Sequence, residues 1–172
     1  IWTLEDLASY NIIERQPIEM AYKGHKIVSA PPPSSGGIAI AAMLNMLSQY
    51  DLSALNNADK THLIVETMRR AYKDRAEFLG DPDFVDVPTE ELISLERAKT
   101  YTASIDMNKA TSSLSLKGPK NIQEGFHTTH FSVIDKAGNR VSATLSINLP
   151  FGSAFTVPNT GVVLNNEMDD FS

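Results

Sequence analysis

The sequence predicts an α+β fold in which helices come first and antiparallel strands follow residue 128. Apolar residues dominate residues 38–47 and recur at helical spacing in residues 59–79. From residue 131 to residue 147 they alternate with polar residues, as in half-buried strands. A polar stretch over residues 106–127 separates the two patterns. This order predicts that helices and strands are segregated along the chain.

The composition describes a globular domain and excludes several functions. The chain has 172 residues, of which 42% are apolar and 21% charged, so it can bury a substantial core. Its net charge of -6 and the lack of a basic patch argue against a nucleic-acid surface. No run of apolar residues is long enough to span a membrane. The absence of cysteine rules out disulfides, thiolate catalysis and cysteine zinc sites, and leaves the cellular compartment open.

Both ends of the sequence suggest a piece of a longer protein. The chain opens at Ile1 without an initiator methionine or the apolar stretch of a signal peptide. It closes on an acidic run, residues 167–170, directly after a strand-like segment. We therefore expect an excerpt of a larger protein, and location cannot be read from a missing signal.

The first 33 residues predict a short helix followed by a hairpin. Thr3 can cap a helix whose first turn contains Glu5 and Asp6, where the helix dipole favours acidic side chains. Residues 17–30 then alternate on both sides of Lys23-Gly24, a turn signal, and end at three prolines.

Three helices are expected next. A Ser-Ser-Gly-Gly turn leads into a mostly apolar helix over residues 38–47, expected to be buried on most sides. Asp59 can cap a second helix that Gly80 ends. A third helix is expected from Thr89 to about Ser104. The broad stripe of the second helix consists of Leu63, Thr67, Met68, Ala71, Tyr72, Ala76 and Leu79.

The polar stretch and the strands complete the chain. Residues 106–127 have no consistent period, so we expect an exposed linker, which at this length calls for a functional reason. The alternating runs on either side of residues 135–139 predict a β-hairpin. A third strand is expected over residues 160–166.

Several kinds of site are poorly supported. His127 and His130 are three apart and would point to opposite faces of a strand, while His25 and His62 are isolated, so no metal site is predicted. The Ser-Ser-Gly-Gly turn lacks the lysine of a phosphate loop. A serine-histidine-acid triad stays open, although no G-x-S-x-G elbow is present.

A threonine nucleophile is the remaining hypothesis. A threonine hydroxyl needs a base beside it, and a free α-amine on the same residue, with a pKa of roughly 7.7 to 8, can be that base. The chain would have to be cut directly before the threonine, and Thr128 stands where the polar stretch meets the first strand of the hairpin. The alternative is that Thr128 is an ordinary strand-forming residue.

Four strings, in this order, closely resemble the γ-glutamyltranspeptidases: "PPPSSGG", "AYKDRAEFLGDPDFV", "TTHFSVIDKAGNRVSATLSIN" and "LNNEMDDF". That resemblance implies an N-terminal nucleophile hydrolase with an αββα sandwich, made by a precursor that cleaves itself. It implies a cut between His127 and Thr128. Residues 1–127 would then end the large subunit, with residues 106–127 as its polar tail, and residues 128–172 would begin the small subunit.

The resemblance also assigns roles to single residues. Thr128 matches the nucleophile, and Ser146 matches a second hydroxyl that contacts the nucleophile and is threonine in many members. Asn148, Glu167 and Asp170 match residues that hold the α-amino-acid head of the substrate, where two carboxylates facing an α-ammonium make sensible ion pairs. Without the resemblance, Ser146, Asn148, Glu167 and Asp170 would be interpreted as ordinary strand and turn residues. No metal or organic cofactor is implied.

The implied reaction is γ-glutamyl transfer and hydrolysis of glutathione and related compounds through a γ-glutamyl-threonine ester, with an amino acid or peptide as acceptor. The family's oxyanion glycines, a serine pair and a substrate-binding arginine lie outside this sequence, so we expect residues 1–172 alone to be inactive. The alternatives are an acylase or a poly-γ-glutamate-processing enzyme of the same superfamily, or a non-catalytic homologous domain. Family members are periplasmic, extracellular or membrane-anchored ectodomains.

Overall fold

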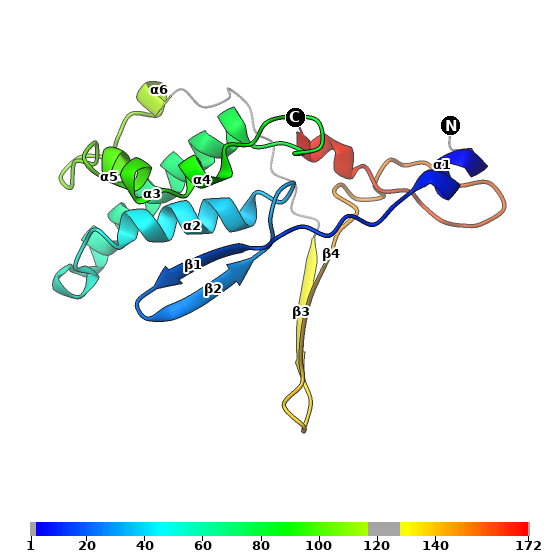
Figure 1. Cartoon of the computed structure of the whole chain (residues 1–172), viewed down its shortest axis with the longest axis horizontal. Coiled ribbons are helices and arrows are strands. Elements are labelled where there is room, and N and C mark those ends of the chain that lie inside the picture. Colours follow the sequence, from blue (N-terminus) through cyan, green and yellow to red (C-terminus); the bar gives the residue numbers. More distant parts are fainter. Residues whose placement is uncertain (1–2, 117–127, 172) are drawn as a thin grey trace. The chain divides into compact units, whose positions relative to one another are not determined.

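A computed structural model describes residues 3–116 and 128–171 of the chain (Figure 1). The chain divides into two compact units, Ile1–Pro119 and Lys120–Ser172, which are described separately. The first contains helices and one β-hairpin, and the second contains another β-hairpin and irregular segments. No helix among the described residues is both long and apolar enough to cross a lipid bilayer.

The first unit opens with the short helix and the hairpin that the sequence predicts. Helix α1 (Leu4–Ser9) has Thr3 as its N-cap, and Asp6 completes a capping box. Strands β1 (Ile18–Tyr22) and β2 (His25–Ser29) pair antiparallel. The turn residues Lys23 and Gly24 have φ of 47° and 80°, the left-handed values of a hairpin turn that matches the strand twist.

Helix α2 (Gly36–Leu47) carries most of the core of this unit. It packs against α3 (Asn57–Phe78), α5 (Leu95–Thr102) and the β1–β2 hairpin. Ile38, Ala41 and Met46 are buried on it. Gly37 allows the close approach to the hairpin, because a Cβ atom there would lie 2.2 Å from the Ala30 carbonyl oxygen. The predicted helix is confirmed, and Gly37 is needed for its packing.

Helix α3 (Asn57–Phe78) departs from the sequence prediction in two respects. Its N-cap is Asn56, whose side chain accepts a hydrogen bond of 2.9 Å from the backbone N–H of Asp59, so Asp59 lies in the first turn. The predicted stripe is wrong at Met68 and Tyr72, which are each 41% exposed, and at Ala76, which is also exposed. Glu66, Arg70 and Asp74 are buried instead, beside the predicted Leu63, Thr67 and Ala71.

Glu66 and Arg70 form a buried cluster with the start of the polar stretch. The Nη1 atom of Arg70 lies 2.5 Å from Oε2 of the Glu66 carboxylate. The backbone N–H of Thr111 donates to the other carboxylate oxygen, Oε1, at 3.0 Å. Arg70 also donates to the Ser104 carbonyl at 3.1 Å. The segment up to residue 111 is therefore attached to α3, and α6 (Ser113–Leu116) follows, so the first part of the expected linker is exposed at most positions but is fixed to the first unit.

The third predicted helix is interrupted. Helix α4 (Thr89–Leu92) ends before Ser94, which caps α5 (Leu95–Thr102) by accepting from the Arg97 N–H at 3.1 Å. A serine side chain that can cap makes a break at this point favourable. Arg97 in turn binds both carboxylate oxygens of buried Asp74 on α3, each at 2.8 Å.

The second unit consists of a two-stranded ribbon and a folded C-terminal segment. Strands β3 (Thr129–Ile134) and β4 (Arg140–Leu145) pair antiparallel, from Thr129 opposite Leu145 to Ile134 opposite Arg140. This confirms the predicted hairpin. The prediction of a third strand is wrong, because residues 160–166 contribute only an isolated bridge from Val163 to Thr156. A 3₁₀ helix, η2 (Glu167–Phe171), follows them.

Candidate active site

The predicted nucleophile and the second predicted hydroxyl lie together. Thr128 directly precedes β3 and Ser146 directly follows β4, and they continue the strand register toward the open end of the ribbon. The Thr128 hydroxyl donates a hydrogen bond of 3.1 Å to the Ser146 hydroxyl. Two strand ends thus bring residues 18 positions apart into direct contact.

Ser146 also holds the next predicted residue. The Ser146 hydroxyl oxygen accepts from the backbone N–H of Asn148 at 3.0 Å. Asn148 has φ of 66°, a left-handed conformation that asparagine adopts more readily than most residues. The chain therefore turns sharply after β4 while remaining hydrogen-bonded to the strand end.

Asn148 connects this turn to the acidic C-terminal segment. Its amide nitrogen donates to the Asn166 carbonyl at 3.1 Å and to a carboxylate oxygen of Asp169 at 3.4 Å. The backbone N–H of Leu149 donates to the Asn166 side chain at 3.1 Å. These bonds place the start of η2 beside the turn. Sequence reasoning missed Asn166 and Asp169, for which the repeated Asn and Asp around Glu167 were the available signal.

Glu167 has an unusual environment. Its backbone N–H donates to the Asn165 side chain at 3.0 Å. Its Oε1 atom is inaccessible and has no hydrogen-bond partner among the described residues. A buried carboxylate oxygen without a partner is costly, so it calls for an explanation, such as a bound water, an ion or another donor. A cationic ligand group would supply that donor.

The remaining predicted positions are only partly described. Asp170 lies on η2, three residues after Glu167, and its side chain is outside the described part of the structure. His127 and the bond to Thr128 also lie outside the described residues. Among residues 3–116 and 128–171, no group of three histidine, aspartate or glutamate side chains could hold a metal ion.

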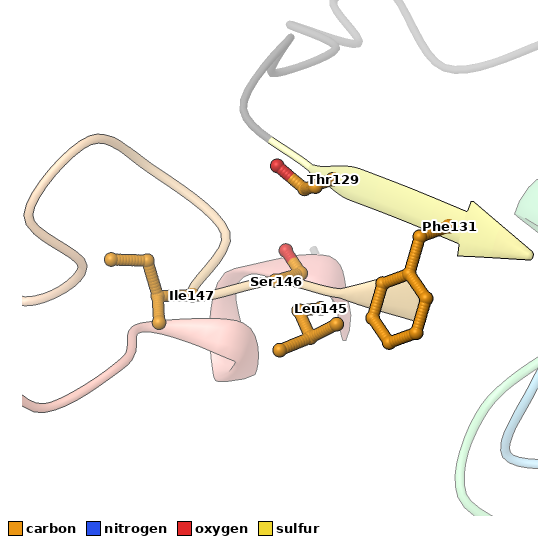
Figure 2. Close-up of a pocket in the computed structure, with 5 residues that line it drawn as sticks. All are labelled: Thr129, Phe131, Leu145, Ser146 and Ile147. Atoms are coloured by element: carbon orange, nitrogen blue, oxygen red, sulfur yellow. The ribbon is translucent and has the colours of Figure 1, made fainter. Parts of the chain in front are cut away.

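An open apolar pocket adjoins the paired hydroxyls. It has a volume of about 550 Å³ and is lined by Thr129, Phe131, Leu145, Ser146 and Ile147 (Figure 2). The lining is formed largely by the apolar residues Phe131, Leu145 and Ile147. The site thus combines two hydroxyls in contact, those of Thr128 and Ser146, with a turn at Asn148 that is bonded to the acidic C-terminal segment.

A threonine hydroxyl can serve as the nucleophile of acyl transfer when a base lies beside it, and Thr128, directly before β3, is the predicted candidate for that role. The sequence model of the family described as gamma-glutamyltranspeptidase matches residues 1–172. The chain therefore belongs to the gamma-glutamyltranspeptidase family.

Individual relatives agree with this assignment. The chain is 44% identical to the glutathione hydrolase proenzyme of Escherichia coli (strain K12), over 99% of this chain and 30% of that protein. It is 43% identical to the acylase ACY 1 proenzyme of Pseudomonas sp. (strain SE83), over 96% of this chain and 30% of that protein. The solved Helicobacter pylori gamma-glutamyltranspeptidase is 42% identical with a TM-score of 0.65, over 73% of this chain and 37% of that one. The chain thus spans about a third of these relatives.

Proposed function

We propose that these 172 residues form part of a precursor that cleaves itself at His127-Thr128 and then transfers and hydrolyses γ-glutamyl groups. The 3.1 Å hydrogen bond between Thr128 and Ser146 carries this proposal, because it couples the predicted nucleophile to a second hydroxyl. The E. coli relative's name, glutathione hydrolase proenzyme, supports both the reaction and the processing.

Maturation uses the nucleophile on its own chain. The Thr128 Oγ1 atom attacks the His127 carbonyl carbon, and the peptide C–N bond breaks as the nitrogen takes a proton, which leaves an ester and a free α-amine. Water then hydrolyses the ester, restores the hydroxyl and releases the His127 carboxylate. The two subunits that we propose, with residues 1–127 in one and residues 128–172 in the other, arise from this cut.

Turnover repeats the attack on a substrate. The α-amine of Thr128 accepts the hydroxyl proton as Oγ1 attacks the γ-carbonyl carbon. The same proton passes to the leaving amine, and a γ-glutamyl-threonine ester forms. Water releases glutamate from that ester, or the amine of an amino acid or peptide takes the γ-glutamyl group. In both cases the threonine is restored.

The head group of the substrate would bind at the acidic segment. A γ-glutamyl compound carries an α-ammonium group, and Glu167 offers a carboxylate oxygen that lacks a partner among the described residues. Asn148, held by Asn166, and Asp170 would complete this subsite. Charge-assisted bonds of this type are short and strong, so they would fix the γ-carbonyl relative to the nucleophile.

We also propose the finer fold and the location from family membership. The β3–β4 ribbon would contribute to one sheet of an αββα sandwich that the whole protein completes. A periplasmic or extracellular location would match the family.

A related acylase is the second candidate, because the Pseudomonas acylase is nearly as similar as the E. coli protein. An acyl group without an α-ammonium would leave Glu167 unpaired, so Glu167 favours γ-glutamyl donors. A comparison of acyl donors with and without an α-ammonium group therefore distinguishes a γ-glutamyl-transferring enzyme from an acylase.

Mass spectrometry and donor kinetics on the whole protein test the proposed function. We expect a new N-terminus at Thr128 and turnover of γ-glutamyl anilide well above that of glutaryl anilide, which keeps the carboxylate and lacks only the α-amino group. Cleavage with the opposite preference would support an acylase. An uncleaved protein without turnover would contradict both and indicate a non-catalytic homologue.

Replacing Ser146 tests the hydroxyl pair. Ser146→Ala leaves Thr128 without its partner and removes the acceptor of the Asn148 N–H, so we expect kcat to fall roughly tenfold to a hundredfold through misplacement of the nucleophile. Ser146→Thr keeps the hydroxyl and should stay within about threefold of the parent. Equal kcat in the alanine variant and the parent would refute the role.

A further inference from the structure

One face of the β3–β4 ribbon carries a continuous row of hydrogen-bonding side chains. Because side chains alternate across a strand, even-numbered residues share this face and odd-numbered residues share the other. The opposite face is apolar and includes Phe131, Val133 and Leu145. The polar row consists of Thr128, His130 and Ser132 on one side and Ser142, Thr144 and Ser146 on the other.

His130 stands at the centre of the row. One ring nitrogen, Nδ1, is hydrogen-bonded to the Thr144 hydroxyl at 2.7 Å. The other, Nε2, is hydrogen-bonded to the Ser142 hydroxyl at 3.0 Å and lies 3.4 Å from that of Ser132. Both nitrogens are therefore engaged, and both reach across to β4.

An imidazole ring can do what the neighbouring hydroxyls cannot. Thr144 lies opposite His130, but Ser142 is diagonal to it, at a separation of roughly 7 to 8 Å between Cα atoms. A serine or threonine side chain is too short to bridge both positions. The ring spans them, and because hydroxyls both donate and accept, it can do so in either neutral tautomer.

We propose that His130 is a positioning residue that holds Thr128 against Ser146 by tying β3 to β4. This rests on the proposed function, in which Thr128 is the nucleophile. Thr128 is two residues from His130 on the same face, and Ser146 is two residues from Thr144. The His130–Thr144 bond thus lies directly inward of the Thr128–Ser146 bond along the ribbon.

Self-cleavage makes such a tie necessary. Once the bond before it is cut, Thr128 is a chain terminus, and chain termini are poorly ordered unless they are held. The bonds of His130 restrain the strand at the second residue after the nucleophile. We infer that they preserve the direction of the Thr128 hydroxyl after cleavage.

Substitution in the whole, matured protein tests this role. His130→Phe keeps a ring of similar size and removes both nitrogens, and we expect kcat for γ-glutamyl anilide to fall roughly tenfold to a hundredfold with KM within about threefold. His130→Gln keeps a donor and an acceptor and should recover much of the loss. A purely structural role would not give this split between kcat and KM or this rescue. Each kcat is calculated per molecule of cleaved protein.

Ser132→Ala is the matched control, because it removes a hydroxyl from the same strand face that makes only the longest contact of His130, at 3.4 Å. It should leave kcat within about twofold. If His130→Phe does not fold, Thr144→Val with the histidine intact should lower kcat by the same mechanism. An active parent whose His130→Phe or Thr144→Val variant keeps its kcat overturns the inference alone. A parent without cleavage at Thr128 overturns the proposed function first.

Discussion

Thr128→Ala should leave the whole protein as a single uncut chain without measurable γ-glutamyl turnover. Alanine lacks the hydroxyl that would attack both the His127 carbonyl and the substrate, and the Ser146 hydroxyl would lose its donor. Because one atom would serve both reactions, the two losses must occur together. Denaturing electrophoresis and a γ-glutamyl anilide assay measure them, and we expect a fall in kcat of about four orders of magnitude or more.

Two neighbouring substitutions sharpen this experiment. Thr128→Ser keeps a hydroxyl and should still cleave, although more slowly, because the missing methyl group allows more side-chain rotation. Thr129→Ala alters the adjacent threonine, on the first residue of β3, and should cleave like the parent. If Thr128→Ala were cut directly before residue 129 while Thr129→Ala stayed whole, the nucleophile would be Thr129.

Local chemistry made much of the fold predictable. The Lys23-Gly24 turn and the turn after Asp135 each place glycine at a left-handed position, with φ of 80° and 85°, between alternating runs. Pairing Thr129 with Leu145 follows from that turn and the alternation. The contact between Thr128 and Ser146 then requires only that the register continue by one residue.

Features that depend on distant partners were not predictable in the same way. Asn148 meets Asn166 and Asp169 because irregular segments fold back, and no period in the sequence records such a path. Glu66 and Arg70 resemble surface residues when only their polarity is considered. Their burial requires Ser104 and Thr111, which lie far along the chain, to supply hydrogen bonds.

Arg70→Met should be among the most destabilising substitutions in the first unit. Glu66 and Arg70 are each 1% exposed, and removing the arginine takes away the buried partner of this carboxylate and leaves the more exposed Arg69, 2.8 Å from its other oxygen. Breaking a buried pair in this way costs about 3 to 5 kcal/mol in the free energy of unfolding. Chemical denaturation of the purified protein measures the difference.

Lys73→Met provides a matched control on the same helix. Lys73 and Glu77 have the same four-residue spacing and lie 2.6 Å apart, but Glu77 is 37% exposed. Such an exposed pair contributes only about 0.3 to 0.5 kcal/mol. Equal losses in the two variants would show that burial does not set the strength of the Glu66–Arg70 pair.

The pH dependence of the free energy of unfolding tests the same cluster through the ionisation of Glu66. Burial alone would raise the pKa of Glu66, but hydrogen bonds from Thr111 and Arg70 outweigh it and lower the pKa from 4.5 to about 2. The unfolded chain therefore binds the proton more tightly, so the contribution of Glu66 is complete above pH 4.5 and is lost as the pH falls toward 2. The shift corresponds to about 3 kcal/mol. The glutamine in Glu66→Gln cannot ionise, so the free energy of unfolding of this variant should lose about 3 kcal/mol less than that of the parent as the pH falls. Curves of unfolding free energy against pH that run parallel for the parent and Glu66→Gln would contradict the lowered pKa of Glu66.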